Sequence, residues 1–181
     1  MSIFKIITSP FRKLRKDDSG NASVEFVFVF PVVMTVFLMA FEVGLLMIRQ
    51  VMLDRAVDIT VRELRMGHIP DPTQDILREI ICNQALIIPS CTSSLLIELR
   101  PVETDPWPEL ATASTTCINR NEEIEPSVAV NPGAPQQVML VRVCSVFDPF
   151  FPSTRLGMQL HRDEIGGYAL VSSSAFVNEP S

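Results

Sequence analysis

The strongest pattern in the chain is a long apolar run near its N-terminus. Phe26–Phe41 contains no charged side chain, and the apolar pattern resumes after Glu42 and continues to Ile48. As a helix, Val24–Ile48 would be roughly 37 Å long, which exceeds the hydrocarbon thickness of a bilayer, about 30 Å. The pattern therefore predicts a helix that spans a membrane.

Two other kinds of apolar segment are less consistent with this pattern. A buried core helix of a soluble protein is usually shorter. A cleaved secretory signal has an apolar region of roughly 7–15 residues that ends in small residues of an Ala-x-Ala kind. Here the run continues through Phe41-Glu-Val-Gly44 and no such site follows it.

A short basic leader, residues 1–20, precedes the run. Its five basic and two acidic residues give it a net charge of +3, whereas the whole chain carries −6. Gly20 ends the leader, and Glu25 follows five residues later. This layout resembles that of a prepilin, in which cleavage after the glycine leaves the carboxylate at mature position five.

The orientation of the span rests on lysines and cysteines. Basic residues flank the run on both sides, so the positive-inside bias is slight. All lysines lie in the leader, however, and all four cysteines follow the run. Paired cysteines in a small acidic domain suit an oxidising compartment. We therefore expect a cytoplasmic N-terminus and an extracytoplasmic C-terminal domain, whose acidity disfavours nucleic acid as a partner.

Three residues of the run are candidates for a role in assembly: Glu25, Pro31 and Glu42. A carboxylate within a bilayer is costly and is usually paired or functional. Cleavage after Gly20 would free an α-ammonium on Asn21, which could pair with Glu25 in its own chain or in a neighbouring subunit; otherwise Glu25 reaches the interface. Glu42 either faces the outer interface or marks a helix–helix contact. Pro31 predicts a kink.

The helix is predicted to continue beyond the membrane as an amphipathic extension, so that residues 21–66 form one helix of about 45 residues. Asp58 and Arg62 have the spacing of an i,i+4 ion pair. Gly67, followed by two prolines, predicts its end. The stripe at helical spacing that we expect to pack on the next domain comprises Leu53, Val57, Val61 and Leu64.

Residues 67–181 are predicted to form a small α+β domain, so that the fold is a long helix packed on an antiparallel sheet, as in pilins. Asp71-Pro72 provides an N-cap and a first-turn proline for a short helix to about Ala85. A polar, proline-containing stretch, 103–136, is long for a loop and suggests a further short strand around 127–130. The predicted main strands are 94–102, 137–147 and 167–177.

The four cysteines allow three pairings. We favour Cys82–Cys91, which would tie the end of the short helix to the turn before the first strand, and Cys117–Cys144, which would tie the long loop to the second strand. No Cys-x-x-Cys occurs, so redox and zinc chemistry are disfavoured. The cysteines are predicted to be structural.

The sequence offers little for catalysis, and we predict no enzyme, cofactor or metal. The histidines, His68 and His161, lack metal-ligand spacing, and no nucleophile-elbow, P-loop or Rossmann motif occurs. The adjacent carboxylates Glu122-Glu123 and Asp163-Glu164 are typical of a solvated face. Trp107 is better explained by packing than by partner contact.

Residues 17–31, which read DDSGNASVEFVFVFP, resemble the opening of TadE-like proteins of the tight-adherence (Flp-type) pilus system. That family also has a Glu-x-Gly after the apolar run, here Glu42-Val-Gly44, and the ending Ala175–Pro180 is similar to its C-terminal signature. The N-terminal resemblance covers roughly residues 17–65.

The resemblance implies a minor pilin or pseudopilin in a bacterial inner membrane. Its expected partners are other pilin subunits, a prepilin peptidase that cuts between Gly20 and Asn21, an assembly platform with its ATPase, and membrane lipid. The alternative is a single-span anchored binding module that keeps its leader and never enters a filament.

Overall fold

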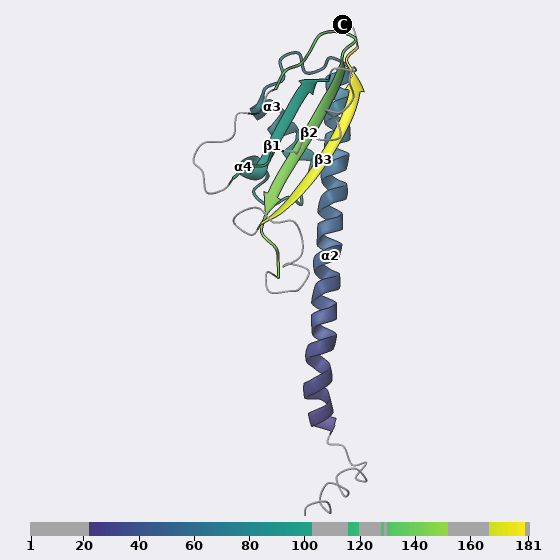
Figure 1. Cartoon of the computed structure of the whole chain (residues 1–181), viewed down its shortest axis with the longest axis vertical. Helices are drawn as coiled ribbons and strands as arrows, with labels where there is room; N and C mark the ends of the chain where they lie inside the picture. The colour runs from purple at the N-terminus through teal and green to yellow at the C-terminus, as the bar shows by residue number, and fades with distance from the viewer. Residues whose placement is uncertain (1–21, 103–115, 120–127, 129, 152–166, 180–181) are drawn as a thin grey trace, which may run out of the picture. The chain divides into compact units, whose positions relative to one another are not determined.

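The computed structural model describes residues 22–102, 116–119, 128, 130–151 and 167–179. The chain has two compact units, Met1–Ala40 and Phe41–Ser181, and we call the second the headpiece. The architecture confirms the predicted α+β fold with a long N-terminal helix. In order, the elements are α2 (Ala22–Arg65), α3 (Gln74–Gln84), α4 (Cys91–Ser94), β1 (Leu95–Pro101), β2 (Val138–Phe147) and β3 (Tyr168–Val177) (Figure 1).

Helix α2 ends at a glycine, as the sequence predicts. Gly67 has a φ of 72°, a backbone conformation that residues with a Cβ rarely adopt. Its N–H donates to the carbonyl of Leu64, and the N–H of His68 donates to the carbonyl of Glu63, both at 3.1 Å. These two bonds form a Schellman motif, which satisfies carbonyls at the helix end that would otherwise lack donors.

Replacing Gly67 with alanine is expected to destabilise the headpiece by about 1 kcal/mol, because a Cβ is strained at this φ although nothing lies within 4 Å of it. The matched control is Gly44→Ala, within α2, where the new Cβ also meets nothing within 4 Å. That variant should be as stable as the wild type or slightly more stable, since alanine favours helix. Denaturant unfolding of the detergent-solubilised protein measures the stability of both variants. Equal changes in stability would contradict the role of Gly67 at the helix end.

The three strands form an antiparallel sheet in the order β1-β2-β3. Glu98 of β1 faces Arg142 of β2, which in turn faces Ser173 of β3. The further strand considered around 127–130 appears, within the described residues, as a single parallel bridge between Val130 and Leu99. The predicted strands match the observed ones to within one residue at each end, whereas the short α4 was not predicted.

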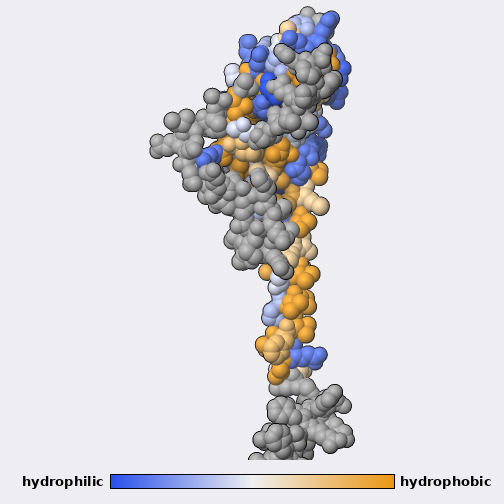
Figure 2. Space-filling model, in the orientation of Figure 1, coloured by the Kyte–Doolittle hydropathy of each residue, from blue (hydrophilic) through white to orange (hydrophobic). Residues whose placement is uncertain are grey.

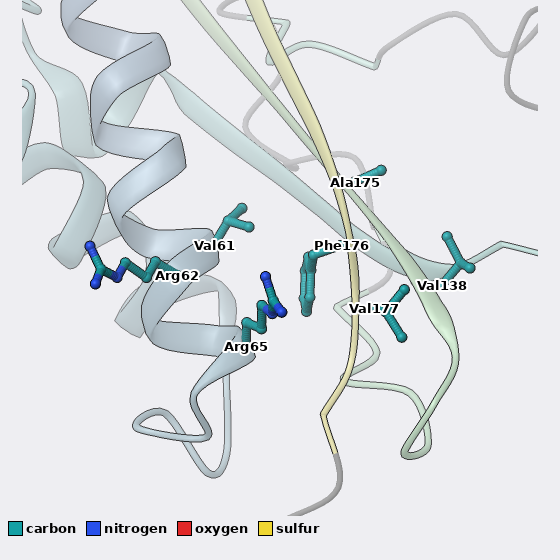
Figure 3. A pocket seen from close by; sticks show the side chains of 7 residues that line it. All are labelled: Val61, Arg62, Arg65, Val138, Ala175, Phe176 and Val177. Carbon is teal, nitrogen blue, oxygen red and sulfur yellow. The ribbon is translucent and has the colours of Figure 1, made fainter.

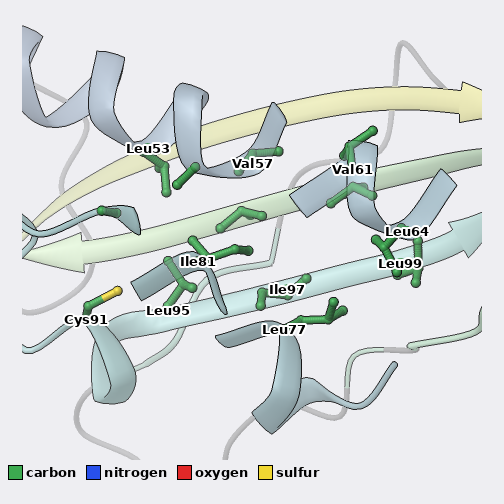
Figure 4. Packing of buried hydrophobic residues seen from close by; sticks show 14 of the residues in the cluster. Leu53, Val57, Val61, Leu64, Leu77, Ile81, Cys91, Leu95, Ile97 and Leu99 are labelled. Carbon is green, nitrogen blue, oxygen red and sulfur yellow. The ribbon is translucent and has the colours of Figure 1, made fainter. Parts of the chain in front are cut away.

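One face of the sheet and the two longer helices enclose the hydrophobic core. The predicted stripe of α2 is buried, and Figure 4 shows its side chains directed toward β1 and α3. Alternate residues of the strands point into this core because side chains of a strand alternate between its faces. The core includes Leu53, Val57, Val61 and Leu64 of α2, Leu77 and Ile81 of α3, Leu95, Ile97 and Leu99 of β1, and Met139, Val141 and Val143 of β2.

Two local predictions for the helices are wrong. The N-cap of α3 is Thr73, whose side chain accepts a hydrogen bond from the N–H of Ile76 at 3.3 Å, and not Asp71. Among the described residues, Asp58 and Arg62 do not form the expected ion pair. The carboxylate that does pair on this part of α2 is Glu63, which lies 2.6 Å from His68 Nδ1.

Two disulfides close the headpiece, with the pairing that the sequence spacing favours. Cys82–Cys91 joins α3 to α4, and Cys117–Cys144 joins the segment 116–119 to β2. Cys144 lies on the face of β2 opposite the core, so this bond holds the buried Ile118 against that face. Strand β2 is consequently buried on both faces, which explains its nearly continuous apolar sequence.

Candidate assembly surface

The first part of α2 presents an unusually apolar surface. Every residue from Ala22 to Val33 is exposed, and Phe28 exposes 73% of its surface. Figure 2 shows apolar residues along this part of the helix. Among the described residues, α2 is also the one helix that is long and apolar enough to cross a membrane, and none of its most apolar stretch is buried. An exposed apolar surface of this size needs a partner, either lipid or other helices.

Glu25 and Pro31 lie on this exposed part of α2. Glu25 is in the first turn and makes no hydrogen bond or ion pair within the described residues. Its expected partner, the amino group at Asn21, and the cut after Gly20 lie outside the described residues. The helix continues through Pro31, whose carbonyl accepts a hydrogen bond from Thr35 Oγ1 at 2.7 Å. Proline has no N–H, so the carbonyl one turn earlier lacks its helical donor.

Glu42 has a different environment, because its side chain is only 2% exposed. Its two carboxylate oxygens accept hydrogen bonds from consecutive backbone amides of the loop after β2. The N–H of Phe150 donates to Oε1 at 3.0 Å, and the N–H of Phe151 donates to Oε2 at 2.9 Å. Charge-assisted bonds of this kind are stronger than neutral ones, so Glu42 fixes this loop to α2.

Aromatic rings surround this contact. The rings of Phe41, Phe150 and Phe151 pack edge to face, with centroids 5.7–6.4 Å apart, and we call them the phenylalanine cluster. Two turns further along α2, the Arg49 guanidinium lies 4.5 Å from the ring centre of Phe147, and its charge also interacts with that of Glu42. The loop is therefore held by charge and by aromatic packing together.

The exposed part of α2 and Glu42 itself both fall in the part of the chain that is similar to a known family, whereas the loop that Glu42 binds does not. Residues 20–62 match the TadE-like protein family. This finding confirms the N-terminal part of the resemblance seen in the sequence and points to a protein associated with the tight-adherence pilus. No curated protein and no solved structure matches the chain. The TadE-like segment contains Glu25, Pro31 and Glu42, whereas the sheet of the headpiece lies outside it.

Both sequence interpretations of Glu42 omitted its contact within the chain. One placed the carboxylate at the outer interface and the other in a contact with another helix, and neither predicted that it binds two loop amides. The signal in the sequence was the pair of phenylalanines between Pro149 and Pro152, an apolar element in a segment that otherwise reads as a turn. The TadE-like segment therefore carries one carboxylate that is exposed, Glu25, and one that is bound internally, Glu42.

A shallow pocket of about 480 Å³ lies where the C-terminal end of the TadE-like segment approaches the edge strand β3. Figure 3 shows Val61 and Arg65 of α2 directed toward Phe176 of β3. Arg65 is bound to Glu179, with Nη2 and Oε1 2.6 Å apart. The described residues that line the pocket provide two arginines and apolar groups but no carboxylate, hydroxyl, thiol or imidazole, so they form no acid–base pair.

Proposed function

We propose that this chain is a single-pass membrane component of tight-adherence pilus assembly, similar to a minor pilin or pseudopilin and without enzymatic activity. The observation that carries the proposal is the exposed apolar first part of α2, Ala22–Val33, which lies within the TadE-like segment. Lipid would cover this surface before assembly, and neighbouring helices would replace lipid in a filament. The function is thus physical, an exchange of one apolar environment for another.

The proposed topology places the leader in the cytoplasm and the headpiece outside the inner membrane. Two features support it: the lysines are confined to the leader, and the cysteines of the headpiece are joined in disulfides, which persist in oxidising compartments. The proposed partners are other pilin subunits, a prepilin peptidase, the assembly platform with its ATPase, and membrane lipid. No nucleic acid, cofactor or metal has a place in this proposal.

Within the membrane, Glu25 is proposed to bind the α-ammonium that cleavage after Gly20 would create on Asn21. The carboxylate is exposed and has no partner among the described residues, so it is available to an amino group of its own chain or of a neighbour. In a low-dielectric environment an isolated charge is costly, and pairing is correspondingly favourable. Such a pair would set the axial position of each subunit relative to the next.

The test is the mass of the mature protein isolated from its native host. Cleavage predicts a chain that begins at Asn21 and occurs in membrane and sheared-pilus fractions. A Gly20→Val variant provides the control, because a bulky residue at the cut should leave the leader in place. A wild-type chain that begins at Met1 or Ser2 and stays entirely in the cell membrane would contradict the pilin-like function.

The second candidate is an anchored binding module that keeps its leader. The pocket between α2 and β3 favours it, since an apolar strand edge beside Arg62, and beside Arg65 with its partner Glu179, suits an extended ligand. The same mass measurement separates the two candidates. An uncleaved protein that is absent from pili would favour the module.

A further inference from the structure

We propose that Phe150 and Phe151 seat the headpiece on the lipid bilayer, at the boundary between the hydrocarbon core and the headgroups. The inference rests on the proposed function, in which the apolar half of α2 crosses the membrane. It adds a second membrane contact, formed by a loop more than 100 residues further along the chain. The headpiece would then rest on the membrane surface, not above it.

The first argument is the exposure of the phenylalanine cluster. Phe150 exposes 62% of its surface and Phe41 exposes 46%, although their rings pack against each other. Large exposed apolar side chains are unfavourable in water and often mark a contact surface. Here the buried carboxylate of Glu42 fixes the backbone of both loop residues, so the ring of Phe150 is held outward and cannot simply fold into the core.

The second argument is depth. The described part of α2 up to Phe41, Ala22–Phe41, extends about 30 Å along the helix, comparable with the thickness of a hydrocarbon core, about 30 Å. We place Phe41 at the outer boundary of that core, because Glu42 directly after it is the first charged residue beyond the run Phe26–Phe41. The ring centres of Phe150 and Phe151 are 6.4 Å and 6.3 Å from that of Phe41, which places them at the same boundary. The interfacial layer beyond it is roughly 5–8 Å thick on each side.

The third argument identifies lipid as the occupant. Phe41 is the last residue of the uncharged run Phe26–Phe41, so the ring of Phe150 extends an apolar surface that the proposed span already exposes to lipid. Phenylalanine favours burial in lipid, and the other large aromatic residues, tryptophan and tyrosine, are enriched at this depth in membrane proteins. Glu42, the first charged residue after the run, is satisfied by the loop amides and needs no contact with water. A neighbouring subunit as the occupant is an outcome that the experiment distinguishes.

The experiment uses tryptophan fluorescence in vesicles that contain brominated phosphatidylcholine, which quenches tryptophan at the depth of the bromine. The chain has one tryptophan, Trp107, so Trp107→Phe provides the background for full-length single-tryptophan variants. Phe150→Trp reports on the proposed contact, and Phe37→Trp on the span itself. Val177→Trp is the matched control, because Val177 is 52% exposed but lies at the opposite end of β3, about 30 Å from the end that follows the loop.

We expect Phe150→Trp to lose at least half of its fluorescence with lipid brominated near the headgroups and less with lipid brominated deep in the chains. Val177→Trp should change by less than a tenth. If Phe37→Trp is quenched and Phe150→Trp is not, the headpiece does not touch the bilayer and the inference is wrong. If Phe37→Trp is not quenched either, the proposed membrane span itself fails. Fluorescence of Phe150→Trp that depends on protein density, and not on bromine, would identify a second copy as the occupant and overturn the lipid contact.

A second measurement avoids reliance on one substitution. All four native cysteines are in disulfides, so a Phe150→Cys variant carries a single site for a nitroxide spin label. At the proposed depth the label should be more accessible to oxygen than to a water-soluble nickel complex. Greater accessibility to the nickel complex, in a protein whose near-ultraviolet circular dichroism is unchanged, would also overturn the inference.

Discussion

Replacing Glu25 with alanine is expected to reduce surface pili by at least tenfold while the protein remains in the membrane. The carboxylate lies in the first turn of α2 and has no partner among the described residues. Its removal therefore leaves folding of the headpiece untouched and makes the apolar segment easier to insert. Assembly should fail because an unpaired amino group would then remain in a low-dielectric environment. Counting pili by electron microscopy and assaying the membrane fraction measure the two effects separately.

A suitable control for this variant is Glu79→Ala, which removes an exposed glutamate from α3 and should leave pili unchanged. Glu25→Gln keeps the shape and removes the charge, so it should be as defective as alanine if charge pairing is the cause. Normal pili in the Glu25→Ala strain would rule out a pairing role for this carboxylate.

Replacing Glu42 with alanine is expected to destabilise the headpiece by about 2–4 kcal/mol. Two hydrogen bonds to a charged acceptor are lost, each contributing roughly 1.5–3 kcal/mol, and water replaces part of them because the loop is half-exposed. The charge of Arg49 also loses its nearby compensation. Tyr168, the single tyrosine, is buried against Phe147 with ring centres 6.0 Å apart. The near-ultraviolet circular dichroism signal of Tyr168, recorded at increasing guanidinium concentration, therefore measures the stability of the headpiece.

Two other substitutions separate the Glu42 contact from a general effect of removing charge from α2. Glu63→Ala breaks an exposed pair with His68 and should cost less than about 1 kcal/mol. Glu42→Gln keeps one carbonyl acceptor and should have an intermediate effect. A Glu42→Ala protein with the unfolding midpoint of the wild type would show that the two amides contribute nothing to stability.

The parts of the fold that the sequence predicts are those encoded by local patterns. Helical spacing located the buried stripe of α2 from Leu53 to Leu64, because a helix that packs on one side repeats its apolar residues every three or four positions. Gly67 predicted the helix end because few other residues tolerate its φ. Strand β2 was found from its valines, which are buried on both faces.

The parts that the sequence does not predict depend on contacts between distant residues or on a choice between similar local options. Glu42 and Phe150 are separated by 108 positions, and no local pattern links a helix carboxylate to the amides of such a distant loop. At the start of α3, Asp71 and Thr73 are both good N-caps two residues apart, so propensity alone cannot choose between them. The interpretation of Glu42 as an assembly residue did not include a partner inside its own chain, because that partner is distant in the sequence.

Residues 53–64 of α2 supply a large part of the hydrophobic core, and this arrangement bears on how the protein sustains mechanical load. The proposed anchor and this core element both belong to helix α2. A pulling force along α2 would be resisted in shear by interlocking side chains against the sheet. Proteolysis between Leu53 and Leu64 would cut through this part of the core.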